Sequence, residues 1–121
     1  MAIEVGREKL RQAILAALAD QDIVKIIDCA TIRPKSVNDV IRETDIPHST
    51  AYRKIKGMLE EGLLVTEKIE ITSDGKKFSL VRSTLKSINI KYERGKTMVQ
   101  VEYNVNVLEQ TAEHLFSINA D

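Results

Sequence analysis

The spacing of apolar residues changes at Gly62, and no other feature constrains the fold as strongly. Before Gly62 apolar residues recur every three or four positions, which predicts amphipathic helices. After it they alternate with polar residues, which predicts strands. A chain with a block of helices followed by a block of strands is typical of the α+β class.

Before Gly62 we expect four helices, over residues 4–19, 22–30, 37–44 and 49–61. Asp20 and Ser36 are the residue types that cap helix starts, and they precede the second and third helices. Ser49 or Thr50 is the expected cap of the fourth helix. Gly62 is the expected stop at its far end.

After Gly62 we expect two hairpins and a last helix. Asp74-Gly75 predicts a two-residue turn in the first hairpin. The resulting pairs are Ile71 with Phe78, Ile69 with Leu80, and Glu67 with Arg82. Arg94-Gly95 predicts the second turn, with the pairs Tyr92–Thr97, Ile90–Val99, Ile88–Val101 and Lys86–Tyr103. Residues 107–117 repeat the helical spacing, with one apolar side formed by Leu108, Ala112, Leu115 and Phe116.

Composition predicts a single domain over residues 1–121, without a membrane segment. Of the 121 residues, 43% are hydrophobic and 30% charged, which is ordinary for a folded protein. No apolar run approaches the roughly 18 residues that a membrane helix needs, and no signal peptide is visible at the start. The single cysteine, Cys29, cannot form an internal disulfide, so we expect a cytoplasmic location.

The charges are unevenly distributed, although the 18 basic and 18 acidic side chains cancel. Residues 46–91 carry nine Lys or Arg and five Asp or Glu, whereas residues 92–121 carry two and five. A basic stretch inside a neutral chain is where a nucleic-acid site is expected.

Residues 36–64 hold the most informative pattern. The short connection 45–48 between two helices fixes them at a steep angle, as in a helix-turn-helix. The second helix has a polar face, and residues 47–58 include three basic and no acidic residues. Such a helix suits the major groove of DNA. The candidate DNA contacts here are His48, Ser49, Thr50, Tyr52, Arg53, Lys54 and Lys56.

These side chains differ in what they offer to DNA. An arginine reads guanine through two hydrogen bonds, so Arg53 is the candidate base reader. Lysines and hydroxyls suit phosphates. Tyr52 has packing on the apolar stripe as an alternative role, and His48 has a turn or cap role.

The stretch DIPHSTAYRKIKGMLEEGLL, residues 45–64, resembles the recognition segment of ArsR-like winged helix-turn-helix regulators, most of all the archaeal branch. The next stretch, LLVTEKIEITSDGKKFSLVRST, resembles their wing hairpin. The resemblance covers residues 10–84 and implies a sequence-specific transcription regulator on double-stranded DNA. It implies helix 49–61 in the major groove, and wing 65–84 on the backbone or minor groove through Lys76 and Lys77.

The expected architecture is α+β: a winged helix-turn-helix core with a wing hairpin, an additional β-hairpin and a C-terminal helix. Residues 10–84 form the core and wing, and residues 85–121 form the rest. The first and last helices have larger apolar faces than a small monomer covers, so we expect a homodimer through them. The resemblance implies the same. Hairpin 86–105 has three open roles: extending the sheet, forming the dimer interface or walling a ligand pocket.

Other functions have less support in the sequence. Cys29, His48 and His114 lack the spacing of a zinc or arsenic site, so no metal or cofactor is expected. No Gly-rich phosphate loop or nucleophile elbow is present, so no enzyme is expected. Two alternatives remain open. One is a winged helix that binds protein without DNA, and the other is a sequence-indifferent chromatin protein.

Overall fold

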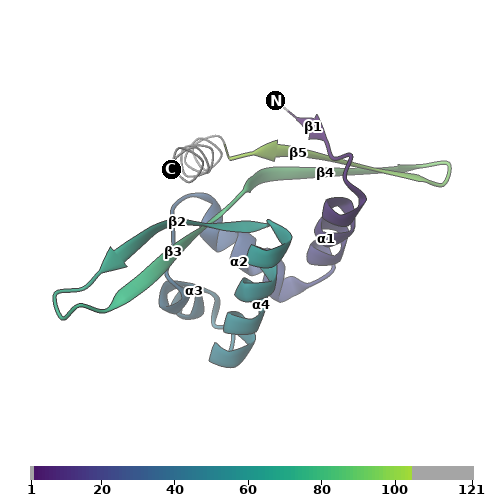
Figure 1. The fold of residues 1–121 in the computed structure, drawn as a ribbon. Coiled ribbons are helices and arrows are strands. Elements are labelled where there is room, and N and C mark those ends of the chain that lie inside the picture. Colours follow the sequence, from purple (N-terminus) through teal and green to yellow (C-terminus); the bar gives the residue numbers. More distant parts are fainter. Residues whose placement is uncertain (1, 105–121) are drawn as a thin grey trace, which may run out of the picture.

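The fold comes from a computed structural model that describes residues 2–104 (Figure 1). In this part of the chain the elements are β1 (Ile3–Glu4), α1 (Glu8–Leu18), α2 (Gln21–Thr31), α3 (Val37–Thr44), α4 (His48–Glu61), β2 (Leu64–Ile71), β3 (Lys77–Ser83), β4 (Leu85–Glu93) and β5 (Lys96–Tyr103). The α+β class is confirmed. The helix expected over residues 107–117 lies outside the described residues.

Both caps predicted for α2 and α3 are present. The carboxylate of Asp20 accepts hydrogen bonds from the backbone N–H groups of Asp22 (3.0 Å) and Ile23 (3.2 Å). At the start of α3, Ser36 Oγ accepts from the N–H of Asp39 at 3.1 Å. Asp39 Oδ2 accepts in return from the N–H of Ser36 at 3.2 Å. The aspartate thus completes a capping box in which glutamate or glutamine is more usual.

Helix α4 begins one residue earlier than predicted and has no side-chain cap. Its N-cap is Pro47, so the prediction that Ser49 or Thr50 caps it was wrong. A capping side chain must precede the N–H groups that it bonds, and both hydroxyls already lie inside the first turn. The helix ends as predicted at Gly62, whose φ of 83° is the left-handed conformation of a C-terminal stop.

The N-terminal residues form a strand where the sequence predicted the start of a helix. Ile3 pairs with Val101 in antiparallel β5, and the N–H of Val5 donates to the carbonyl of Val99 at 2.8 Å. Helix α1 begins only at Glu8. The edge of β5 offers backbone partners to this segment, and Val5 becomes buried there. A distant strand thus overrode the local helical pattern.

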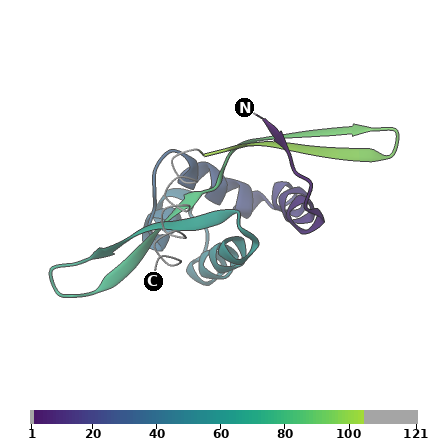
Figure 2. The ribbon, with the colours of Figure 1, turned by 45° about the horizontal axis from the view of Figure 1, so that its top comes forward.

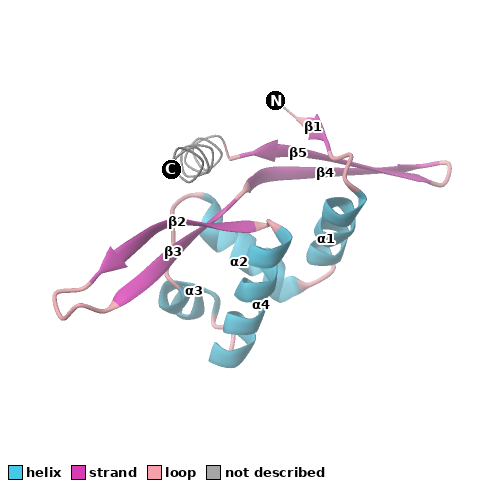
Figure 3. Ribbon diagram, in the orientation of Figure 1, coloured by secondary structure: helices cyan, strands magenta, loops and turns pink. Residues whose placement is uncertain are grey.

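The strands form two separate antiparallel sheets. One is the β2–β3 hairpin, and the other has the strand order β1-β5-β4. In Figure 3 α1 lies below β4 and β5, and α3 and α4 lie below β2 and β3. The two hairpins extend to opposite ends of the molecule (Figures 2 and 3). In Figure 2, β4 and β5 run well past α1 to a free tip.

The register predicted for the second hairpin is confirmed over most of its length. Three predicted pairs are present, and they are Ile88–Val101, Ile90–Val99 and Tyr92–Thr97. Arg94 and Gly95 form the turn with φ values of 50° and 78°, as a two-residue hairpin turn requires. The fourth predicted pair, Lys86 with Tyr103, was wrong. An irregularity between Leu85 and Ser87 shifts the register, so that Leu85 pairs with Tyr103.

The register predicted for the first hairpin was wrong by one residue. Ile71 pairs with Lys77 and Ile69 with Ser79, because the turn is longer than Asp74-Gly75 alone. The N–H of Thr72 donates to the carbonyl of Lys76 at 2.8 Å, which closes a loop of residues 73–75. Gly75, with φ of 86°, takes the left-handed position that this loop requires.

The shifted register changes which side chains share a face of β2–β3. Phe78 lies opposite Glu70, and Leu80 lies opposite Lys68, so neither is on the face of Ile69 and Ile71. Both isoleucines are exposed. The predicted strand pair Glu67–Arg82 is also absent, because Arg82 pairs with Val65, but the two side chains form an ion pair at 3.2 Å.

The apolar faces of the helices meet in one core. Its fully buried residues include Ile14 of α1, Ile26 of α2, Val40 of α3 and Met58 of α4. The segment before α3 is tied to β3 by two backbone hydrogen bonds between Lys35 and Val81, at 2.9 and 2.8 Å. These bonds attach the β2–β3 hairpin to the α3–α4 pair.

Candidate nucleic-acid interface

Helices α3 and α4 are joined by a tight connection of Asp45, Ile46 and Pro47. Asp45 takes a left-handed conformation with φ of 61°, and its N–H donates to the carbonyl of Ile41 at 2.9 Å. Aspartate tolerates this conformation better than most residues. Ile46 is buried in the core and anchors the turn. The geometry fixes where α4 starts relative to α3.

Helix α4 has one buried side and one exposed side. Ala51, Ile55 and Met58 point into the core. The exposed side chains are His48, Ser49, Tyr52, Arg53 and Lys56, and Thr50 is half-buried. Lys54 is half-buried like Thr50, so all seven predicted contacts on this helix lie at least partly open to solvent, and no acidic residue stands among them.

Two aromatic side chains lie together at the start of α4. The rings of His48 and Tyr52 have centroids 4.6 Å apart and planes tilted by 39°. Residues four apart share a helix face, and both residues are exposed. The tyrosine therefore does not pack into the core, although the sequence left packing on the apolar stripe open as an alternative role for it.

Within residues 2–104, Lys54 is the one predicted contact on α4 that forms an ion pair. Its ammonium pairs with the carboxylate of Asp20 and lies 4.0 Å from that of Asp22. The hydrogen bond from Lys54 is the main reason that the pKa of Asp20 lies below its ordinary value. Lys54 thus ties α4 to the start of α2. It does not belong to the exposed row of α4, by which we mean His48, Ser49, Tyr52, Arg53 and Lys56.

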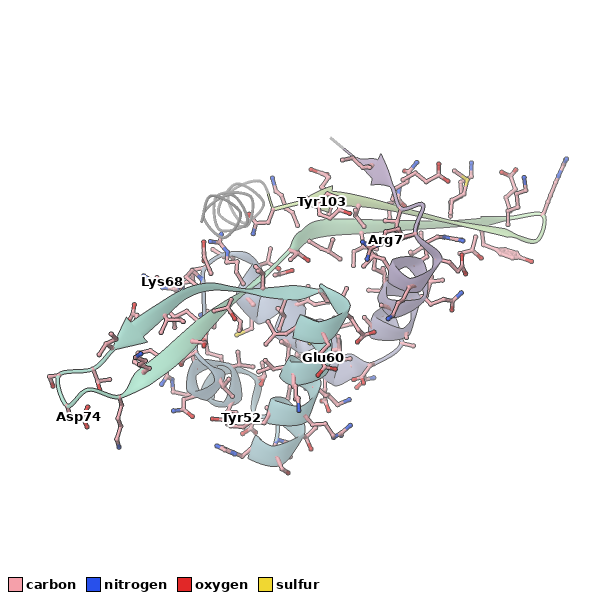
Figure 4. All side chains as sticks on the ribbon, in the orientation of Figure 1. Arg7, Tyr52, Glu60, Lys68, Asp74 and Tyr103 are labelled. Carbon is pink, nitrogen blue, oxygen red and sulfur yellow. The ribbon has the colours of Figure 1, made fainter. Side chains whose placement is uncertain are left out.

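The predicted contacts on the hairpin, Lys76 and Lys77, are both exposed near its tip. Asp74 lies beside them, and its pKa is lowered chiefly by a hydrogen bond from the Thr72 hydroxyl. In Figure 4 Asp74 at this tip and Tyr52 on α4 both lie along the lower side of the molecule. The tip of the β2–β3 hairpin and the part of α4 that carries Tyr52 therefore lie on one side of the molecule in that view.

Arg82 holds the base of this hairpin against the end of α2. Its Nε and Nη2 atoms donate to the carbonyls of Thr31 (3.1 Å) and Ile32 (2.8 Å), while Nη1 donates to Glu67. Those carbonyls have no partner within their own helix, and α2 has no basic residue in its last turn. The sequence signalled only the Glu67–Arg82 pair and gave no sign of α2 as the third partner.

A further group of ionisable side chains lies around Glu43. Cys29 is half-buried, with Sγ 3.8 Å from Glu43 Oε2. Burial and then the charge of Glu43 raise the pKa of this thiol. Lys35 holds the same carboxylate at 2.7 and 2.8 Å. Within residues 2–104 no cluster of three His, Cys, Asp or Glu is placed to hold a metal ion.

Two further results come from the whole of the described chain and from comparison with known proteins. Among residues 2–104 no helix is long and apolar enough to cross a membrane. Protein-family models and curated proteins were both compared with the chain, and neither comparison returned a match. The function must therefore be argued from the residues and their geometry.

Proposed function

We propose that this protein is a cytoplasmic winged helix-turn-helix transcription regulator that binds double-stranded DNA as a homodimer. The observation that carries the proposal is the exposed row on α4. After a three-residue turn, the row presents Ser49, Arg53 and Lys56 on one side of a helix that buries its other side. A helix held in this way fits the major groove.

The order of elements supports the winged-helix interpretation. Helices α3 and α4 are followed directly by β2–β3, and the Lys35–Val81 bonds join that hairpin to the segment before α3. In the proposal α4 is the recognition helix and β2–β3 is the wing. Lys76 and Lys77 then contact the DNA backbone or minor groove beside the recognition helix.

The side chains divide into base and phosphate contacts. Arg53 donates two hydrogen bonds to a guanine, which is worth about 1–3 kcal/mol of discrimination. Lys56, with the hydroxyls of Ser49 and Thr50, contacts phosphates and positions the helix. Lys54 is left out of this set, because its ammonium is engaged with Asp20.

Dimerisation would match the protein to a two-fold symmetric operator. Two recognition helices on one face of B-DNA read half-sites about 34 Å apart. The arrangement requires a self-complementary interface away from α4, since the same patch must meet itself across the two-fold axis.

The test is fluorescence anisotropy of labelled duplex DNA over a salt series. The variants are Arg53→Ala/Lys56→Ala and the control Lys9→Ala/Lys96→Ala, which removes two exposed basic residues outside α4 and the wing. We expect the first variant to lose the binding and its salt dependence, and the control to keep both. No binding by the wild type at low salt would contradict the proposal.

A protein-binding winged helix is the second candidate, favoured by one observation. The His48–Tyr52 pair exposes aromatic surface at the start of α4, and aromatic residues are enriched in protein interfaces. This candidate predicts that Tyr52→Ala abolishes binding to a protein partner in a chain with no DNA affinity. Equal affinity for unrelated DNA sequences would instead indicate a chromatin protein.

A further inference from the structure

An apolar surface runs along the outer side of α2 and continues onto β4. Its centre is a groove of about 410 Å³, whose apolar lining is Leu18, Val24, Ile27, Ile32, Leu85 and Ile88. Ile88 is followed on the same face of β4 by Ile90 and Tyr92. We call the groove and these two residues the α2–β4 surface.

The exposure of large apolar side chains on this surface is high. Ile32 is 82% exposed, Tyr92 67%, Leu18 43% and Ile90 36%. Single exposed apolar residues are ordinary, but a contiguous apolar patch marks a site of interaction. The groove also lies on the side of the sheet that α1 covers only in part, since β4–β5 extends past that helix (Figure 2).

We propose that the α2–β4 surface binds a second copy of this chain, and that residues 105–121 of that copy lie in the groove. The inference rests on the homodimer of the proposed function and adds which surfaces meet. It also assigns to the second hairpin one of its three open roles, the dimer interface.

The sequence of residues 105–121 has the chemistry to fill the groove. Its predicted helix has an apolar side formed by Leu108, Ala112, Leu115 and Phe116. Its charged residues are Glu109, Glu113 and Asp121, with no lysine or arginine. The groove wall carries one basic and one acidic side chain, Lys86 and Asp28, among mostly apolar residues. The apolar side of an amphipathic helix is therefore complementary to the apolar lining of this groove.

The point from which this segment leaves the described chain also fits. Asn104 is buried, and its Nδ2 donates to the carbonyl of Thr31 at 3.1 Å. Thr31 lines the groove. The segment of each copy therefore starts beside the groove of its own subunit. In a two-fold dimer, each copy can place its segment in the groove of the other.

Length favours the second copy as the occupant over the same chain. Tyr92 lies seven residues along β4 from Leu85, which is about 23 Å at strand spacing. A helix over residues 107–117 is only about 16 Å long. The segment of the same chain would fill the groove and leave Tyr92 uncovered. A partner that brings its own α2–β4 surface covers both parts.

The experiment measures the mass of the full chain by size-exclusion chromatography with light scattering, without DNA. The variants are Ile32→Glu, Tyr92→Lys and Leu115→Glu, and the matched control is Ile69→Glu. The control changes another exposed isoleucine, 61% exposed, on β2. Circular dichroism checks that each variant folds. Ile32 and Tyr92 are largely exposed in one chain, so we expect their substitution to leave its fold intact.

We expect the wild type and Ile69→Glu to have twice the 13.6 kDa of one chain, and the three variants to have 13.6 kDa. A monomeric wild type would overturn the proposal, and so would Ile32→Glu and Tyr92→Lys variants that remain dimeric. A dimeric Leu115→Glu would overturn the assignment of residues 105–121 as the occupant.

The outcome is separable from that of the DNA-binding proposal. A dimer that dissociates in these variants but never binds DNA would leave this inference in place and contradict the DNA function. A DNA-binding dimer that is insensitive to all three substitutions would leave the DNA function in place and contradict this inference.

Discussion

Lys54 has a structural role that its position in a basic helix does not reveal. Its neighbours Arg53 and Lys56 extend into solvent, whereas its ammonium reaches the start of α2. Asp20 then serves two helices, since one oxygen caps α2 and the other accepts from Lys54. The orientation of α4 thus depends on a contact with a residue 34 positions away.

We predict that Lys54→Met lowers the free energy of unfolding by about 1 kcal/mol, the upper range for a pair near the surface. The loss is expected at neutral pH. The pKa of Asp20 is lowered in the folded state, so its stabilising contribution is present above the unfolded pKa and disappears as pH falls through the folded value. The difference between the variant and the wild type should therefore shrink as pH falls below 3.8, the ordinary pKa of an aspartate.

Urea unfolding at pH 7 and at pH 3 measures both effects. Lys56→Met is the matched control, because Lys56 is exposed on the same helix. Equal losses of stability in the two variants at pH 7 would show that the Lys54 contact does not stabilise the fold.

At the scale of the elements, α2 connects the parts that the proposed function uses. Its first residues are joined to α4 through Asp20, and its last carbonyls are joined to β3 through Arg82. The carbonyl of Thr31 also accepts from Asn104 at the end of β5. Helix α4, the β2–β3 hairpin and the second sheet are therefore all bonded to α2.

Arg82→Met should lower the free energy of unfolding by about 3 kcal/mol, because it leaves Glu67 without a partner. The side chain of Glu67 is only 8% exposed, so water does not replace the lost ion pair. Chemical denaturation measures the change.

Lys68→Met is the control for this prediction. It removes an ion pair with Glu70 in which both side chains are exposed, and we expect a loss below about 0.5 kcal/mol. If Glu67→Gln/Arg82→Met is no more stable than Arg82→Met, the unpaired carboxylate is not the cause of the loss.

Predictions were correct for the elements whose limits depend on residues close to them in sequence. The helices of residues 21–61 were predicted to within one residue, because caps and apolar spacing act within a few positions. The turn at Arg94-Gly95 set its register for the same reason. The register predicted for the first hairpin was wrong because Thr72 takes part in its turn. The strand β1 was not predicted because its partner lies almost a hundred residues away.

At the scale of the whole molecule, the proposed dimer through the α2–β4 surface would couple association to stability. A protein that unfolds from a dimer to separate chains is stabilised by mass action. We expect the melting temperature of the wild type to rise by roughly 3–5 °C for each tenfold rise in concentration. Ile32→Glu should melt at a temperature independent of concentration.

Differential scanning fluorimetry over a hundredfold range of concentration tests this expectation. Ile69→Glu provides the reference, since it should retain the concentration dependence of the wild type. A wild type whose melting temperature is the same at every concentration would argue against a dimer that is coupled to folding.

The sequence by itself determined the class of the fold, the helix limits of residues 21–61, the second hairpin and the exposed row of α4. These depend on side-chain periodicity and on turn and cap residues, whose effects are local. The tertiary structure decided that Lys54 faces inward, that Arg82 meets α2, and that Ile3–Glu4 forms a strand. Each of these depends on a partner distant in sequence, and one chain read alone does not say which distant groups will meet.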